Sequence, residues 1–213
     1  MISAVLWDFG GVLTTSPFEA FNRFEKEQEL PDNFLRTVNS TNPDQNAWAL
    51  FERSKIGADE FDQLFLTEST ALGHPIAGAE VIKLLSGNIR PNMVSALKKI
   101  AKTHQCVCLT NNVPAGKGPG MSRSAEEQKA VLDVMGIFDQ VIQSSKIGMR
   151  KPDPQIYTYT CEKMGVSPDQ ILYLDDLGVN LKPAAAMGMK TIKVLSEEQA
   201  LRDLSAHLNL KFD

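Results

Sequence analysis

The feature that most constrains this chain is a short apolar run that ends in an acidic residue and two glycines. Residues 4–7 read Ala-Val-Leu-Trp and are followed by Asp8, Phe9, Gly10 and Gly11. The run has the length and composition of a fully buried strand and is too short to span a membrane. Because ligands of an open parallel sheet bind beyond the strand ends, Asp8 is a candidate nucleophile or metal ligand. On its own, however, such a stretch is more often a plain turn.

From Pro91 onwards, helical and strand patterns alternate along the chain. This alternation predicts an α/β protein with a parallel sheet and right-handed crossovers. The carboxyl ends of the strands then bring Asp8, Thr110 and Asp176 into one crevice. The strands that we expect after the first one lie at 107–109, around 141, at 171–174 and at 191–194.

Residues 17–88 show almost no strand pattern. Aromatic side chains recur three apart at Phe18, Phe21 and Phe24, and prolines and glycines divide the segment into four or five short helices. We therefore expect a helical insertion. A stripe of this kind is usually core, so we assign these Phe residues to packing rather than to a ligand. The turn at residues 54–57 is expected to be exposed rather than to reach the crevice.

Composition excludes several classes of partner. The net charge of −4 argues against nucleic acid, which is bound mainly through Lys and Arg, whereas a small phosphorylated substrate needs only a local positive charge. No apolar run has the length of a membrane helix and no secretory signal is present, so we expect a cytoplasmic protein without a membrane partner. The three cysteines lack disulfide or zinc spacing and are expected to be core residues. A homodimer stays open, because the apolar residues of 17–88 suit an interface as well as a core.

Three carboxylates are expected to meet at the crevice. Asp175 and Asp176 follow the strand at 171–174, as Asp8 follows the first strand. Such a cluster is unfavourable without a cation, and hard oxygen ligands with room for water suit Mg²⁺. The alternative for the adjacent pair is a solvated turn or a helix cap.

Polar residues at other loop positions suit a phosphoryl group. Thr110 and Asn111 place a hydroxyl and amides at a strand end, and Lys151, held extended by Pro152, is available to neutralise an aspartate or a phosphate. Each also has a structural reading, as a helix cap for Thr110 and a solvated side chain for Lys151. The glycines at 116, 118 and 120 match no phosphate-binding fingerprint, so we expect a mobile loop there.

Together these residues resemble the haloacid dehalogenase superfamily, whose four motifs occur here in order. The likeness is nearest to the N-terminal phosphatase domain of soluble epoxide hydrolases, through residues 148–157 (GMRKPDPQIY) and 174–189 (LDDLGVNLKPAAAMGM). It covers nearly the whole chain and is weak in the insertion. The four motifs are Asp8-Phe9-Gly10-Gly11-Val12, Leu109-Thr110-Asn111-Asn112, Lys151-Pro152 and Leu174-Asp175-Asp176.

The resemblance implies a Rossmann-like three-layer core at residues 1–16 and 89–213 and a helical cap at residues 17–88. It implies a Mg²⁺-dependent phosphatase in which Asp8 attacks phosphorus to form an aspartyl-phosphate. The resemblance assigns charge balance to Lys151. It assigns phosphate binding to Phe9, Gly10, Thr110 and Asn111. It assigns metal binding to Asp8, the Gly10 carbonyl and Asp176, with Asp175 acting through water.

One departure from the family matters. Family phosphatases usually carry a second Asp two residues after the nucleophile, which protonates the leaving oxygen, and Gly10 stands there. General acid catalysis is typically worth about 10²- to 10⁴-fold, so alkyl phosphates should turn over slowly and acyl or aryl phosphates should suffer less.

Two functions other than a phosphatase stay open. A 2-haloacid dehalogenase would use Asp8 on carbon without metal, but related dehalogenases generally lack the adjacent Asp pair and carry an aromatic residue where Gly10 stands. A catalytically weak binding or regulatory domain would bind metal or phosphate without turnover.

Overall fold

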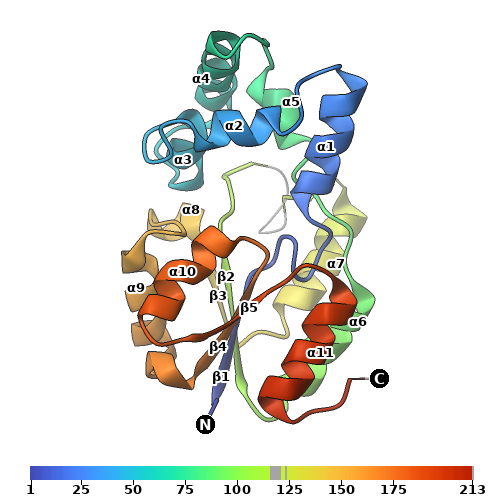
Figure 1. Cartoon of the computed structure of the whole chain (residues 1–213), viewed down its shortest axis with the longest axis vertical. Helices are drawn as coiled ribbons and strands as arrows, with labels where there is room; N and C mark the ends of the chain where they lie inside the picture. The colour runs from blue at the N-terminus through green and yellow to red at the C-terminus, as the bar shows by residue number, and fades with distance from the viewer. Residues whose placement is uncertain (116–120, 123, 213) are drawn as a thin grey trace.

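A parallel sheet forms the centre of the molecule. The computed structural model describes residues 1–115, 121–122 and 124–212, and within them the strands lie in the order β3-β2-β1-β4-β5 (Figure 1). Every neighbouring pair is parallel, so the expected sheet and its strands are confirmed. The strands are β1 (Ala4–Trp7), β2 (Gln105–Thr110), β3 (Gln140–Gln143), β4 (Ile171–Asp175) and β5 (Lys190–Lys193).

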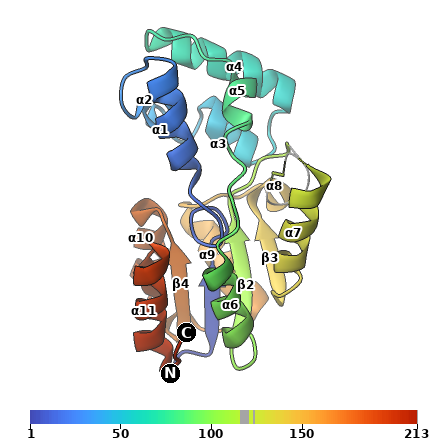
Figure 2. The ribbon, with the colours of Figure 1, turned by 90° about the vertical axis from the view of Figure 1, so that its right-hand side faces the viewer.

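Helices cover both faces of the sheet and make it the middle of three layers (Figures 1 and 2). The alternation along β1 shows how: Val5 and Trp7 pack into one apolar cluster with α6, α7 and α11, whereas Ala4 and Leu6 pack into another with α9 and α10. Burial on both faces explains why the strand is a continuous apolar run. The helices are α6 (Pro91–Ile100), α7 (Ala125–Met135), α9 (Pro154–Met164), α10 (Gly178–Ala186) and α11 (Glu197–Leu208).

Local signals set the ends of α9 as the sequence predicts. The Asp153 side chain accepts a hydrogen bond from the Gln155 N–H, Pro154 occupies the first turn, and Gly165 ends the helix in the left-handed region. Two short elements, α8 (Ser144–Ile147) and the 3₁₀ turn η1 (Pro168–Gln170), were not expected, because such lengths show no periodicity.

The segment between β1 and α6 is helical, as expected, and lies beyond the carboxyl ends of the strands (Figure 1). It has its own apolar cluster, which includes Phe21, Phe51, Phe61 and Phe65. The chain enters and leaves side by side, since the Thr15 N–H donates to the Asn88 carbonyl at 2.8 Å. The exact division into two domains stays a prediction. The helices are α1 (Pro17–Glu27), α2 (Phe34–Ser40), α3 (Ala47–Glu52), α4 (Ala58–Ala71) and α5 (Gly78–Ile82).

Several smaller expectations can be compared with the structure. Cys106 and Cys108 are buried and free, and Cys161 is free and partly buried. In the turn at 54–57, Ser54, Lys55 and Gly57 are exposed and none of the four residues lines the cavity described below, as expected, although Ile56 is buried and the Ser54 hydroxyl donates to the Ser145 carbonyl at 2.7 Å. The glycine-rich stretch at 116–120 lies outside the described residues. In the described part of the chain, no helix combines the length and apolar character that a membrane crossing requires. The cytoplasmic location, the absence of a nucleic-acid partner and the homodimer stay predictions.

Candidate active site

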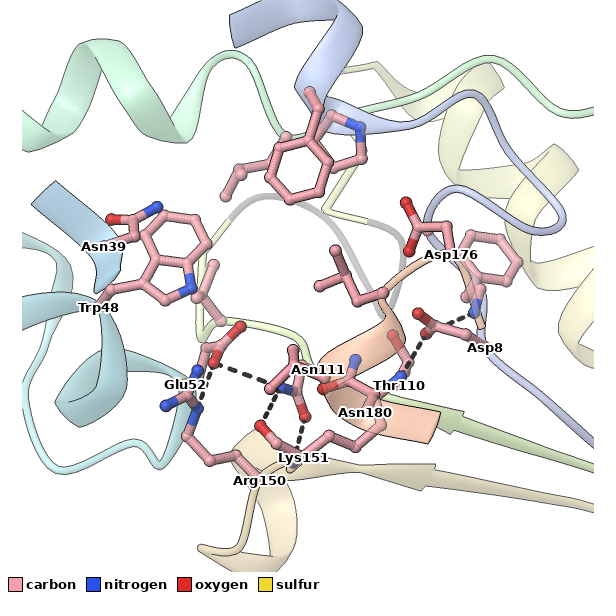
Figure 3. Close-up of a pocket in the computed structure, with 18 of the residues that line it drawn as sticks. Asp8, Asn39, Trp48, Glu52, Thr110, Asn111, Arg150, Lys151, Asp176 and Asn180 are labelled. Carbon is pink, nitrogen blue, oxygen red and sulfur yellow. Dashed lines mark hydrogen bonds and ion pairs between the residues drawn. The ribbon is translucent and has the colours of Figure 1, made fainter. Parts of the chain in front are cut away.

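The strand ends converge on one cavity, as the sequence predicts. Asp8 follows β1, Thr110 ends β2 and Asp176 follows β4, and all three line a cavity of about 480 Å³ between the sheet and the helical insertion (Figure 3). Lys151 lines the same cavity. The site thus occupies the position where an open α/β sheet binds its ligands.

A buried cluster of one ammonium and two carboxylates lies at the floor of the cavity. Lys151 Nζ is 2.9 Å from Asp8 Oδ1 and 2.7 Å from Asp175 Oδ2, and its side chain is only 1% exposed. The sequence alone allowed a solvated lysine at this position, and the structure shows the opposite. Removing one member of such a cluster would leave uncompensated buried charge, which is strongly unfavourable.

The charges of this cluster follow from its geometry. Burial lowers the pKa of Lys151, but the adjacent Asp175 and Asp8 outweigh this effect and raise the pKa above its ordinary value, so the ammonium is protonated. Burial raises the pKa of Asp8 well above its ordinary value, and the Asp175 and Asp176 carboxylates add to the shift, while the Lys151 ammonium opposes it. Lys151 therefore favours the ionised form that a nucleophile requires against the effect of burial.

The two oxygens of Asp8 have different surroundings. Oδ1 accepts hydrogen bonds from Lys151 Nζ and from the Phe9 N–H at 2.7 Å. Oδ2 accepts no hydrogen bond from any residue that the structure describes. The side chain is therefore fixed through one oxygen and keeps the other for a ligand or a reaction.

Asp175 is held by protein donors on both oxygens. Besides Lys151, Tyr173 Oη donates to Oδ2, the Leu177 N–H donates to Oδ1 at 2.8 Å, and Asn180 Nδ2 lies 3.1 Å from each oxygen. This residue is fully buried. The sequence analysis missed Tyr173 and Asn180. The two-residue alternation along β4 and the helical pattern after it do place both side chains near the Asp pair.

Three carboxylates provide a set of ligands that suits a divalent cation. One oxygen each of Asp8, Asp175 and Asp176 lies within 4.8 Å of the others. Burial, followed by the charge of Asp175, raises the pKa of Asp176 to about 6, although the Ser16 hydroxyl donates to Asp176 Oδ2 at 3.0 Å and opposes the shift. Hard carboxylate oxygens and a strongly negative site fit Mg²⁺. Because the oxygens of Asp175 already accept from protein donors, Asp8 and Asp176 are the better placed ligands.

The two glycines after Phe9 differ in what they allow. Gly11 has a φ of +75°, and an added Cβ would overlap the Asp176 carboxylate, so only glycine fits there. At Gly10 an added Cβ would have no heavy atom within 4 Å. The space for the acid that the family usually carries is therefore present, and only the side chain is missing.

Thr110 and Asn111 have unequal positions. Thr110 is buried at the cavity wall. The Asn111 side chain instead holds the peptide of Lys151, because its Oδ1 accepts from the Lys151 N–H and its Nδ2 donates to the Lys151 carbonyl, each at 2.9 Å. The amide side chain is thus engaged by the protein. Phosphate binding by Thr110, by the main chain of Asn111, and by Phe9 and Gly10 stays a prediction.

The insertion supplies the roof of the cavity, which the sequence did not reveal. Phe18 and Phe21 of α1 line it together with Trp48 of α3. The assignment of these two Phe residues to packing alone was therefore incomplete, because they contact the apolar cluster and also face the cavity. An apolar stripe at helical spacing looks the same in both roles, so the sequence held no signal for the second.

The fold and this cluster define a haloacid dehalogenase-type hydrolase. The model of the haloacid dehalogenase-like hydrolases matches residues 2–188, and the chain belongs to that family. The resemblance stated from the four motifs is confirmed.

Relatives and solved structures support the assignment. The chain is 28% identical to the bifunctional epoxide hydrolase 2 of Mus musculus over 97% of its own length, and it spans 39% of that protein. It is 28% identical to the sesquiterpene phosphatase astK of Aspergillus oryzae, with 87% of this chain and 86% of that protein matched. A HAD family enzyme of Bacteroides thetaiotaomicron, solved with magnesium and inorganic phosphate, matches with a TM-score of 0.59 at 19% identity, over 90% of this chain and 93% of that one.

Proposed function

We propose that this hydrolase is a Mg²⁺-dependent phosphatase that acts through Asp8. The observation that carries the proposal is the asymmetry of the Asp8 carboxylate. One oxygen is fixed by Lys151 and the Phe9 N–H, while the other accepts no hydrogen bond from the described residues and borders the cavity. A carboxylate that is positioned in this way, next to an ammonium that favours its ionised form, suits nucleophilic catalysis.

The reaction has two steps. Asp8 Oδ2 attacks phosphorus, the bond from phosphorus to the leaving oxygen breaks, and that oxygen departs with the electron pair. Water then attacks the phosphorus of the aspartyl-phosphate, the bond from phosphorus to Asp8 Oδ2 breaks with its electron pair on the carboxylate, and the attacking water gives one proton to solvent to yield inorganic phosphate. Lys151 offsets negative charge at Asp8 throughout, which is the electrostatic contribution that phosphoryl transfer chiefly needs.

Asp8, Asp176 and the Gly10 carbonyl would hold Mg²⁺, with Asp175 acting through water. When bound, the ion supplies positive charge next to the transferring group. Asp175 keeps Lys151 in place and is itself fixed by Tyr173 and Asn180.

The residues that line the cavity favour a particular class of phosphorylated substrate. Its walls include Phe18, Phe21, Trp48 and Leu85, which favour an apolar leaving group. Gly10 offers no acid to the leaving oxygen, so a leaving group that departs without a proton is preferred. An aryl or acyl phosphate, or a diphosphate with an apolar body, meets both requirements. The likeness to a sesquiterpene phosphatase is consistent with an apolar body.

Phosphate release from a panel of aryl, acyl, alkyl and prenyl phosphates tests the proposal, with Mg²⁺ or with EDTA, for the wild type and Asp8→Asn. We expect release that requires Mg²⁺ and is lost in Asp8→Asn. Chloride release from 2-chloropropionate with EDTA would point instead to a dehalogenase. Mg²⁺ binding without release from any member would point to a binding domain.

A further inference from the structure

We propose that Glu52, in helix α3 of the insertion, is a positioning residue for the catalytic Lys151, acting through Arg150 and Asn111. The inference rests on the proposed function insofar as Lys151 takes part in phosphoryl transfer. Neither Glu52 nor Arg150 belongs to the four motifs, and the sequence analysis assigned no role to either.

The first link is a buried ion pair between the insertion and the core. Arg150 Nε lies 2.5 Å from Glu52 Oε2, and the two side chains are 14% and 7% exposed. Arg150 also donates from Nη1 to the Pro43 carbonyl at 3.0 Å, so the guanidinium joins two parts of the insertion. An ion pair so far removed from water is costly to break, because the remaining charge is left uncompensated.

The second link leads from this pair to the peptide of Lys151. Arg150 directly precedes Lys151, and Asn111 Nδ2 lies 3.4 Å from Glu52 Oε2 while it donates to the Lys151 carbonyl at 2.9 Å. Asn111 Oδ1 accepts from the Lys151 N–H. Glu52 therefore contacts both the residue before Lys151 and the side chain that holds its peptide.

The third link is the ammonium itself. Lys151 Nζ lies between Asp8 and Asp175, and a small displacement of its backbone would lengthen both contacts. Residues that orient a catalytic group through its hydrogen-bond partners typically change activity by about 10- to 100-fold when they are replaced. The helical insertion therefore completes the catalytic floor as well as forming the roof.

A contrasting contact shows why Glu52 is singled out. The Ser54 hydroxyl also joins the insertion to the core, but it donates to the Ser145 carbonyl and not to the Lys151 peptide. Glu25 is a second buried glutamate of the insertion, and among the residues that the structure describes it accepts only from the Asn33 and Leu35 N–H groups, both within the insertion. Glu25→Gln is thus a matched control for Glu52→Gln.

Hydrogen exchange and steady-state kinetics of the whole chain test the inference together. We expect Glu52→Gln to raise amide exchange in a peptide that covers residues 148–156 and to lower kcat by about 10- to 100-fold with little change in KM. Glu25→Gln should leave both unchanged, whatever its effect on the melting temperature. Arg150→Gln should behave like Glu52→Gln, and the double variant should be no worse than the more severe single one.

The two readouts separate failure of the inference from failure of the proposed function. Unchanged exchange at 148–156 in Glu52→Gln would overturn the positioning role even in an active phosphatase. If exchange rises but the wild type releases no phosphate, the positioning of Lys151 stands and the phosphatase proposal fails. A kcat loss that Glu25→Gln matches would reduce Glu52 to a stabilising residue.

Discussion

The floor and the roof of the cavity are built on different principles. At the floor, Asp8, Asp175 and Lys151 are fixed by short contacts, and almost every polar atom has a partner. At the roof, Phe18, Phe21 and Trp48 present apolar surface with little direction. Under the proposed function, the floor would determine which bond is broken, because charge and geometry are fixed there. The roof would select the molecule that carries the bond, because apolar contact depends on size and shape.

Removal of the charge at the floor should have the largest effect. Lys151→Met leaves Asp8 and Asp175 as uncompensated carboxylates, so we expect a loss of about 3–5 kcal/mol in stability. Phosphate release should fall by at least about 10²- to 10³-fold. Denaturant titration and kcat/KM measure the two effects. Lys163→Met, which removes an exposed lysine beside Tyr159, is the control and should change neither. A stable, active Lys151→Met protein would show that the ion cluster is not essential.

An acidic side chain introduced at Gly10, at the floor of the cavity, should change the chemistry and leave the roof unaltered. The space around Gly10 admits a side chain, so Gly10→Asp should raise the turnover of alkyl phosphates by about 10²-fold and that of acyl phosphates much less. The slope of log kcat/KM against leaving-group pKa reports this directly. Gly11→Asp is the matched variant, and it should unfold the site because of its overlap with Asp176. An unchanged slope in Gly10→Asp would mean that another group already supplies the proton.

Trimming the roof should alter substrate selection without altering chemistry. Phe18→Ala removes apolar wall, and the loss of about 1.5–3 kcal/mol of burial corresponds to a rise of about 10- to 100-fold in KM for an apolar aryl phosphate. KM for acetyl phosphate and both kcat values should stay nearly constant. Phe24, on the same helix but outside this cavity, provides the control Phe24→Ala. Equal effects of Phe18→Ala on both substrates would contradict a separate role for the roof.

Acidification should weaken metal binding at the floor, and we expect this effect to be smaller than those of the three substitutions above. The pKa of Asp176 is raised to about 6, so its carboxylate gains a proton as the pH falls through that value, and a protonated carboxyl is a poor ligand. From pH 6 to pH 5 the apparent affinity for Mg²⁺ should fall by about fivefold, because the ionised fraction of Asp176 falls by that factor as a proton competes with the ion. Calorimetric titration at several pH values measures the slope. A pH-independent affinity over this range would remove Asp176 from the ligand set.

The floor was largely predictable from the sequence, because its signals are local. An apolar run fixes β1, a cap and a proline fix the start of α9, and each strand end delivers its polar residue to the same edge. The partners of these residues were less visible. The alternation along β4 and the helical pattern after it place Tyr173 and Asn180 near Asp175, but only the structure shows that both hydrogen-bond its carboxylate.

The links between roof and floor were not predictable, for a physical reason. Glu52 and Arg150 are 98 positions apart in the chain, and their contact exists only because α3 packs against α8, which precedes the loop that carries Arg150. A buried glutamate cannot be told from an exposed one by sequence when its partner lies far away in the chain. The double role of Phe18 was equally hidden, because core packing and cavity lining require the same side chain.

The most direct measurement is the mass of the peptide that contains Asp8, taken after acid quench of the enzyme with Mg²⁺ and excess acetyl phosphate. We expect a population of wild-type peptide heavier by one phosphoryl group and none in Asp8→Asn, because Asp8 Oδ2 forms the covalent bond. Phosphate release by Asp8→Asn at the wild-type rate, with no adduct in either protein, would contradict catalysis through Asp8.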